Sequence, residues 1–350
     1  MNPFSKSKSI LLPAALGVLA ACNHGAPVEI PDSEKKLDHL IIEEICYSGS
    51  WHAKWGTAYT EDKYIKITNP TEKTFYLDGM ALAQSGLSPR KLQNLRAGTD
   101  HRNTHFGAYV LLQFPGLPGE QKYPVDPGKS VYIAKIAHDH TKPGEDGEES
   151  TYCENSYDLS KVDFEWGTVE QIQNEDEFPE NPDVPNMLTI YPTEASEQSA
   201  PPRLISENGA LALIRIPAEV TAQKLLTGDE YIWKTYWTSE EKEGGGGIAG
   251  NTGHTHDNDF DPVVFLKIPN EWVVDVVQIC PQHEFQWNVV ADKLDKGYCS
   301  VYTSSSDKRS NPQGFTGKSL RRKHDGKKFV DNNDSTIDFE VVPATLSKTK

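Results

Sequence analysis

The sequence predicts an all-β fold, an antiparallel β-sandwich with long loop insertions, from three observations. Short runs rich in Ile, Val, Tyr and Phe recur between Gly, Pro, Asn and Asp residues, which is the pattern of strands separated by turns. Helical periodicity is scarce. Residues 63–68 also alternate, with Lys66 facing one side and Ile65 and Ile67 facing the other, as in a strand with one buried face. Many short strands of this kind favour two packed sheets.

Turn signals separate the expected strands in order along the chain. Asn-Pro at 69–70 ends one strand, Pro-Gly at 127–128 precedes another, and Asn-Gly at 208–209 precedes a third. Asn bonds to its own backbone, Pro fixes φ and Gly allows positive φ, so turns explain these pairs without a ligand. We expect strands at residues 39–47, 63–68, 75–77, 108–114, 130–136, 210–216, 263–268, 273–279 and 338–342.

Long polar stretches lie between these strands, at residues 84–105, 138–208 and 218–260. Loops of this length within a compact domain are functional or disordered. The strands on either side of them belong to the same expected sandwich, so we predict a single elaborated domain over residues 38–350. Loops on a rigid scaffold often carry function, and binding residues are therefore expected in these stretches.

The first residues have the pattern of a bacterial lipoprotein signal. Lys6 and Lys8 precede a short apolar run, and Leu-Ala-Ala-Cys at residues 19–22 resembles a lipobox. We expect residues 1–21 to be a signal peptide, Cys22 to carry the lipid, and residues 22–37 to be a flexible tether. The acyl chains then anchor the domain to the lipid bilayer without spanning it.

Acidic residues after Cys22 indicate on which side of the outer membrane the protein lies. Glu29, Asp32 and Glu34 weakly resemble the export signals of surface lipoproteins in Bacteroidota. They favour the cell surface, with the periplasmic face as the alternative. We therefore expect a cell-envelope protein that is lipid-anchored to the outer membrane.

The charge balance narrows the function classes. The chain has 35 Lys and Arg against 51 Asp and Glu, a net charge of −16. Binding of nucleic acid needs clustered basic residues, so no such partner is expected. The sequence lacks the P-loop, the dinucleotide-binding glycines, the zinc-protease motif and the serine-hydrolase elbow, and we expect a noncatalytic protein. A glycan or phosphoester hydrolase is kept as an alternative, since paired carboxylates suffice for such chemistry.

The order of several sequence blocks resembles the lamin-tail family, whose domain is an immunoglobulin-like sandwich. The blocks are YIKITNP at 64–70, LDGM at 77–80, NG at 208–209 and VVD at 273–275. Two positions depart from the family pattern, because Lys66 stands where a Glu is usual and Met80 stands where a Trp is usual.

A narrower resemblance spans residues 38–343. The segments QFPG at 113–116, YDLS at 157–160, VPN at 184–186 and NDSTIDFE at 333–340 are similar to those of uncharacterised Bacteroidota lipoproteins with a lamin-tail-like domain. Genes of that group are often found beside TonB-dependent receptors. The resemblance implies a ligand- or partner-binding accessory of an outer-membrane TonB-dependent transporter, for nutrient or metal uptake, and it implies no reaction.

Four cysteines follow the tether, and the compartment beyond the inner membrane permits disulfides. Four cysteines allow three pairings. Cys280 and Cys299 are the closest in sequence and form the preferred bridge, while a bridge between Cys46 and Cys153 would join an early strand to a later loop. Buried free thiols are the alternative, because they are common.

Histidine and aspartate residues in the loops suggest a divalent metal such as Zn, Fe or Ca. Residues two apart in an extended segment point the same way, so pairs of this spacing can chelate one ion with added carboxylate oxygen. This makes a metal-capture protein the first alternative function. A mobile polar loop is the simpler explanation. The candidate ligands are His254, His256, Asp257, Asp259, His138 and His140, and His101 and His105 form a further pair.

Several tryptophans are candidate binding platforms. Trp51 and Trp55 fall in an expected loop, where large aromatic side chains are unusual, and Trp233 and Trp237 form a second pair. Tryptophan on a loop often stacks on a sugar or anchors a partner. The alternative is that these rings pack against the edges of the sandwich.

Overall fold

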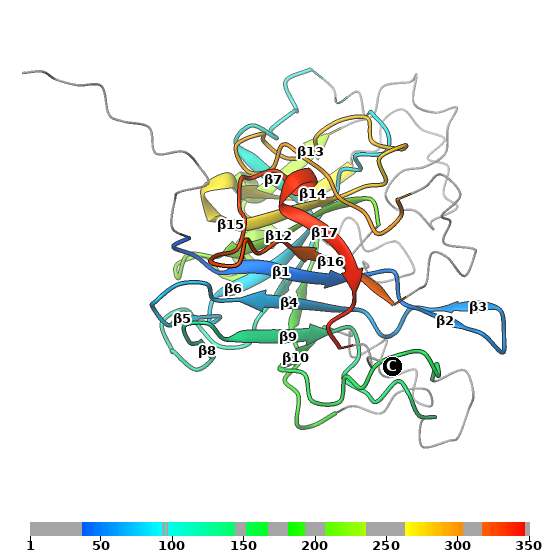
Figure 1. The fold of residues 1–350 in the computed structure, drawn as a ribbon. Coiled ribbons are helices and arrows are strands. Elements are labelled where there is room, and N and C mark those ends of the chain that lie inside the picture. Colours follow the sequence, from blue (N-terminus) through cyan, green and yellow to red (C-terminus); the bar gives the residue numbers. More distant parts are fainter. Residues whose placement is uncertain are drawn as a thin grey trace, which may run out of the picture. The chain divides into compact units, whose positions relative to one another are not determined.

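Two β-sheets and two short two-stranded ribbons make up the described part of the chain (Figure 1). The computed structural model describes residues 37–92, 95, 97–143, 152–166, 181–192, 207–235, 263–303 and 317–346. Residues 36–350 group into one unit by their contacts. Among the described residues no helix has the length and apolar character to cross a membrane.

The six-stranded sheet is antiparallel except where β10 joins β9 in parallel. Its strands, in spatial order, are β10 (Phe164–Glu165), β9 (Ser130–Ala134), β4 (Tyr64–Thr68), β1 (Ile41–Cys46), β16 (Lys318–Arg322) and β17 (Phe339–Pro343).

The seven-stranded sheet is antiparallel at every described pairing. Its strands, in order, are β13 (Ile232–Thr235), β14 (Val263–Pro269), β7 (His105–Gln113), β6 (Met80–Ser85), β12 (Gly209–Arg215) and β15 (Val273–Ile279), with β11 (Leu188–Ile190) paired to β7. The short helical elements of the described chain are α2 (Ala222–Thr227), η4 (Asp229–Tyr231), η6 (Asn270–Trp272) and α3 (Ser335–Asp338).

One of the two ribbons joins strands that are adjacent in the sequence, and the other joins strands that are far apart in it. β2 (Ser50–His52) and β3 (Thr57–Tyr59) form a hairpin, whereas β5 (Phe75–Tyr76) pairs with β8 (Pro124–Val125). The prediction of an all-β fold is confirmed, and each expected strand has a counterpart. Eight of the described strands have no counterpart among the expected ones: β2, β3, β6, β8, β10, β11, β13 and β16.

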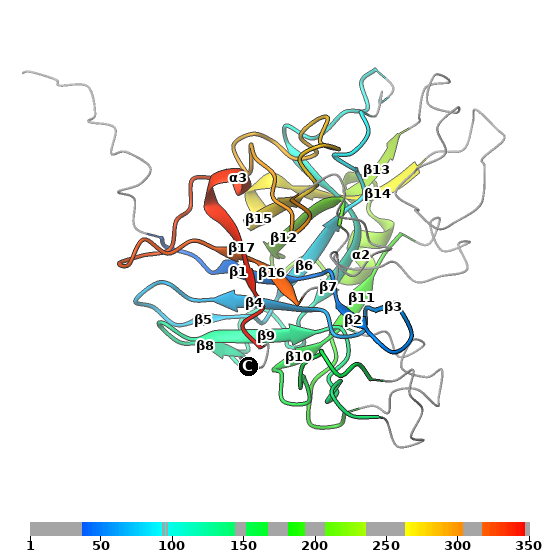
Figure 2. The ribbon, with the colours of Figure 1, turned by 45° about the vertical axis from the view of Figure 1, so that its right-hand side comes forward.

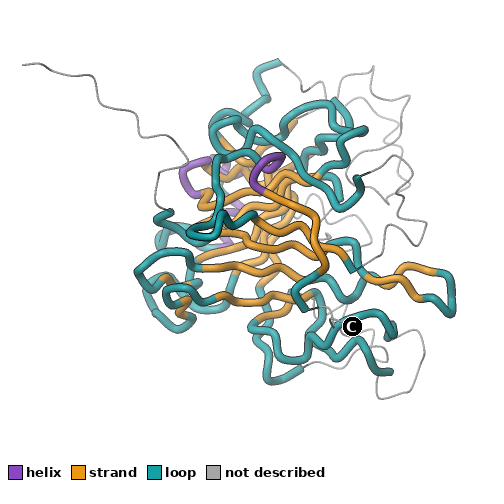
Figure 3. Tube along the Cα trace, viewed as in Figure 1, coloured by secondary structure: helices purple, strands orange, loops and turns teal. Residues whose placement is uncertain are grey.

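The main core lies between the two sheets, which are drawn as layers of strands in Figure 3. Ile42, Ile45 and Ile65 from the six-stranded sheet share one buried cluster with Leu82 and Leu211 from the other sheet. Burial of such side chains stabilises by about 1.5–3 kcal/mol each. The face-to-face arrangement is that of a β-sandwich.

The long insertions cover the outer faces of the sheets. Leu225 of α2 and Trp287 pack on the outer side of the seven-stranded sheet, and Tyr157 and Leu159 pack on Cys46 and other residues of the six-stranded sheet. This explains why the sequence shows little strict alternation. A strand that is covered on both faces has apolar residues on both, and the first six residues of β12, all apolar, are buried.

A buried ion pair joins the sheets. The Arg322 guanidinium on β16 donates to both carboxylate oxygens of Asp275 on β15, at 2.8 and 2.7 Å. The Ile42 amide on β1 donates to the same carboxylate at 2.6 Å. Arg322 also lies 3.2 Å from Asp331 and 4.7 Å from the centre of the Phe339 ring. Three strands are thereby fixed around one charged group.

Removal of one partner should therefore strongly destabilise the fold. Arg322→Met leaves Asp275 buried without its cation, and we expect a loss of about 3–5 kcal/mol in the free energy of unfolding, measured by urea denaturation. Arg322→Met with Asp275→Leu should cost less than the sum of the two single changes. Arg321→Met on the same strand is the control. A midpoint for Arg322→Met equal to that of the control would contradict this role.

Candidate functional site

The β2–β3 hairpin projects from the end of β1 (Figures 1 and 2). Its strands pair Ser50 with Tyr59, and His52 with Thr57. The Gly56 amide donates to the His52 carbonyl at 2.9 Å and closes the turn. Gly56 has φ of 62°, a conformation that glycine adopts without strain. The sequence therefore forms a tight hairpin here, although its strands are short.

Trp55 stands at the turn of this hairpin and is 54% exposed. Its ring meets the ring of His52 edge to face, with 6.1 Å between centroids. The Lys54 ammonium lies 5.3 Å from the centroid of the same ring. These contacts orient the indole while leaving much of it in water. An exposed large aromatic of this kind is a candidate contact residue.

The root of the hairpin is bound to a buried carboxylate. Asp62 is fully buried and accepts hydrogen bonds from the Ser50 hydroxyl and, at 2.7 Å, from the Ser156 hydroxyl. Burial raises the pKa of Asp62 to about 6, against the opposing effect of the two hydroxyls. Asp62 thus joins β2 to the loop around residue 156.

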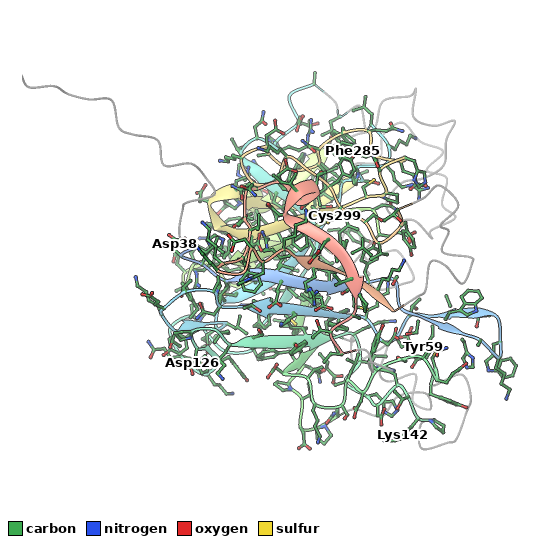
Figure 4. All side chains as sticks on the ribbon, viewed as in Figure 1. Asp38, Tyr59, Asp126, Lys142, Phe285 and Cys299 are labelled. Atoms are coloured by element: carbon green, nitrogen blue, oxygen red, sulfur yellow. The ribbon has the colours of Figure 1, made fainter. Side chains whose placement is uncertain are left out.

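Two further contacts hold the hairpin against the loop of residues 136–157. The Tyr59 hydroxyl donates to Nδ1 of His140 at 2.6 Å, and the Trp51 carbonyl accepts from the Cys153 thiol at 3.4 Å and the Asn155 amide at 3.4 Å. Figure 4 shows Tyr59 and Lys142 on the same side of the domain. The hairpin therefore has a rigid base and an exposed tip.

The expected metal pair His138 and His140 does not form a metal site in this structure. Nε2 of His140 donates to the Ile136 carbonyl at 3.0 Å and Nδ1 accepts from Tyr59, so both ring nitrogens are engaged. Burial lowers the pKa of His140 to about 4, which keeps the imidazole neutral. Within the described residues no group of three or more His, Cys, Asp or Glu side chains is placed to hold a metal.

The remaining sequence candidates divide into two groups. Trp51 is half-buried, and Trp233 is 0% exposed. The expectation that Trp233 is a platform is wrong, because its ring packs against Phe265 at 5.9 Å and leaves no room for a Cβ at Gly107. The other candidates lie outside the described residues; they are Cys22, Trp237, His254, His256, Asp257 and Asp259.

The expected disulfides are not formed, and Cys46, Cys153, Cys280 and Cys299 are free thiols. Cys280 and Cys299 are neighbours, since the Cys280 amide donates to the Cys299 carbonyl at 3.0 Å. However, Cys299 is the bridge partner of Ile279. Adjacent strand residues point to opposite faces, so the thiol of Cys280 turns away from that of Cys299.

The carboxylates of Asp331 and Asp334, which precede the last strand, bind other groups of the same chain. Asp334 caps α3 by accepting from the Thr336 amide at 3.1 Å, and Asp331 lies 3.4 Å from His39. These carboxylates therefore stabilise the C-terminal strand. The contacts also raise the pKa of His39 to about 9 despite its burial.

Sequence reasoning found Trp51, Trp55, His140 and Cys153 separately. It did not predict that Trp51, His140 and Cys153 meet at the base of one hairpin, which Asp62 completes, while Trp55 stands at its tip. No local signal indicates this, because Asp62 and Ser156 are 94 residues apart in the chain.

A family model described as "Protein of unknown function (DUF4876)" matches residues 126–345. The chain belongs to this family. The fold of this chain is similar to that of a solved structure. It is the crystal structure of a DUF4876 family protein from Bacteroides thetaiotaomicron VPI-5482, with a TM-score of 0.63 and 22% identity, covering 87% of this chain and 71% of that chain. A comparison with curated proteins finds no match.

The raised pKa of Asp62 predicts a pH dependence. The folded state holds a proton on Asp62 below about pH 6, whereas the ordinary value is 3.8. This group therefore adds stability as the pH falls from about 6 towards 4. Asp62→Asn should lose this increment, up to about 3 kcal/mol, in urea unfolding at pH 4 relative to pH 7.5. The exposed Asp183→Asn is the control, and parallel pH curves for wild type and Asp62→Asn would contradict the assignment.

Proposed function

We propose that this DUF4876 protein is a noncatalytic binding protein whose contact surface is the β2–β3 hairpin. The observation that carries the proposal is the exposure of Trp55, at 54%, on a hairpin whose base is fixed by Asp62 and Tyr59. A preorganised aromatic anchor loses little conformational entropy on binding. Tryptophan is also the side chain most enriched among residues that dominate binding energy.

A pocket away from the hairpin gives no support to hydrolysis. A pocket of about 160 Å³ lies between the β5–β8 ribbon and β9, and its lining includes one carboxylate, Asp163. Glycoside hydrolysis needs two carboxyl groups on either side of the scissile bond, roughly 5–10 Å apart. The Asp163 carboxylate is also engaged, since it accepts from the Tyr132 amide at 2.7 Å.

The proposed setting is the outer membrane, with Cys22 as the lipid anchor and a TonB-dependent transporter as the partner. The direction of β1 supports it. The chain enters β1 at Ile41 and leaves it towards the hairpin at Cys46, and Asp38 and Tyr59 lie on opposite sides of the domain (Figure 4). The described chain thus enters the sandwich on the side away from the base of the hairpin.

The proposed fold type is the immunoglobulin-like sandwich of lamin-tail domains. Three of the resembling blocks support it by their positions in strands. The block at 64–70 begins β4, the Asn-Gly pair leads into β12, and the block at 273–275 begins β15. These strands all contribute to the core between the two sheets.

Site-specific photo-crosslinking tests the proposed function. A photoreactive benzoylphenylalanine replaces Trp55 in the lipidated protein made in its own cells, and Leu117, which is 67% exposed, is replaced in the control. We expect a crosslink to an outer-membrane transporter from position 55 and none from position 117, with the partner identified by mass spectrometry. Equal crosslinking from both positions, or no transporter from position 55, would refute the proposal.

A second variant separates binding from folding. Trp55→Ala removes the exposed ring without touching the core, so the unfolding midpoint should stay within about 0.5 kcal/mol of wild type. Recovery of the transporter with the purified protein should fall by at least about tenfold, which corresponds to a hot-spot loss of more than 1 kcal/mol. Leu117→Ala should leave recovery unchanged.

A further inference from the structure

His101 and His105 stand at the two ends of a single turn, and His105 is also the first residue of β7. The His105 amide donates to the His101 carbonyl at 2.8 Å, as in one turn of α-helix. The centroids of the two imidazole rings are 6.1 Å apart, with 77° between the ring planes. The closure of this turn brings the two rings side by side, and histidines four residues apart can ligate one metal ion.

Hydrogen bonds around Thr104 select the tautomer of His105. The Thr104 hydroxyl donates to the His101 carbonyl at 3.2 Å. Its oxygen can then accept from Nδ1 of His105, which lies 2.8 Å away. Nδ1 therefore carries the proton and Nε2 keeps its lone pair. A metal-binding histidine commonly donates its other ring N–H in this way.

The turn is held rigidly from two sides. The Arg102 guanidinium binds Asp100 at 2.8 Å, donates to the Asn288 carbonyl at 2.5 Å and lies 4.2 Å from the centre of the Trp287 ring. On the other side, Asn270 donates from its backbone to Thr104 at 2.9 Å and from its side chain to Arg102 at 3.1 Å. Because these contacts already fix the turn, a metal ion can bind without a change in the conformation of the turn.

The charges around the two rings favour the neutral imidazole. Burial lowers the pKa of both His101 and His105, and the Lys267 ammonium lowers both further. Glu271 follows Asn270 in the chain and acts on His105 in the opposite direction. Metal ligation requires the deprotonated imidazole nitrogen.

We propose that His101 and His105 form a two-histidine site for a divalent transition metal, with water in the remaining positions. Imidazole nitrogen suits zinc, copper and nickel. The site is separate from the hairpin and does not depend on its function. It also differs from the pair at 254 and 256, which lies outside the described residues.

Tryptophan fluorescence tests this site directly, because the ring of His101 lies 5.3 Å from the ring of Trp233. Titration of the full mature chain with CuCl₂ should quench part of the emission. His101→Ala and His105→Ala should each abolish that quenching, and Trp233→Phe should remove the quenched component while calorimetry with ZnCl₂ still detects binding. Trp55→Ala should change neither result.

Matched variants decide between the two histidine pairs. The double variant His254→Ala with His256→Ala should retain the quenching by CuCl₂ and the calorimetric binding of ZnCl₂ at the site of His101 and His105. The double variant His101→Ala with His105→Ala should lose both. His283→Ala, on another loop, is the control for nonspecific surface binding. Full binding by His101→Ala with His105→Ala, or complete loss in the variant at 254 and 256, would overturn the proposal.

Discussion

The buried contact of Arg322 with Asp275 constrains the arrangement of the two sheets. Both side chains are almost fully buried, with exposures of 1% and 5%, and two isolated charges at that depth would cost several kcal/mol each. The cost is offset because Arg322 binds both carboxylate oxygens and the Ile42 amide completes the carboxylate. The contact thereby fixes β15 against β1 and β16. Slippage of one sheet over the other would leave these charges unpaired.

Buried carboxylates also fix loops and a chain end through hydrogen bonds. Glu44 is fully buried on β1 and accepts from the Tyr64 hydroxyl at 2.7 Å, the Ser319 hydroxyl at 2.6 Å and the Thr345 amide at 2.8 Å. Asp62 fixes the base of the hairpin in a similar way. Part of the acidity of the chain is therefore structural, because these carboxylates hold segments that are distant in sequence. At the tip of the hairpin Trp55 is 54% exposed, so much of its indole is available for a partner.

Local features could be predicted from the sequence, and features that depend on distant partners could not. The strands followed from apolar runs and turn residues, because both act within a few positions. The burial of Trp233 cannot be predicted locally, because its ring packs on Gly107, more than a hundred residues earlier. Cys280 and Cys299 are adjacent as expected, but the pleat of the strand sends their thiols to opposite faces. The spacing of His101 and His105 is visible in the sequence, yet their turn depends on Asn270 and Arg102, which only the fold brings together.

Amide hydrogen exchange of Ile42 tests most directly whether the ion pair locks the sandwich while the hairpin remains separate. The Ile42 amide donates to Asp275 between the sheets, so it should exchange only through global unfolding, with the same urea dependence as the whole domain. Amides of Lys54 and Trp55 at the hairpin turn should exchange orders of magnitude faster, through local opening. Exchange of Ile42 as fast as that of the hairpin turn, and independent of urea, would contradict the account.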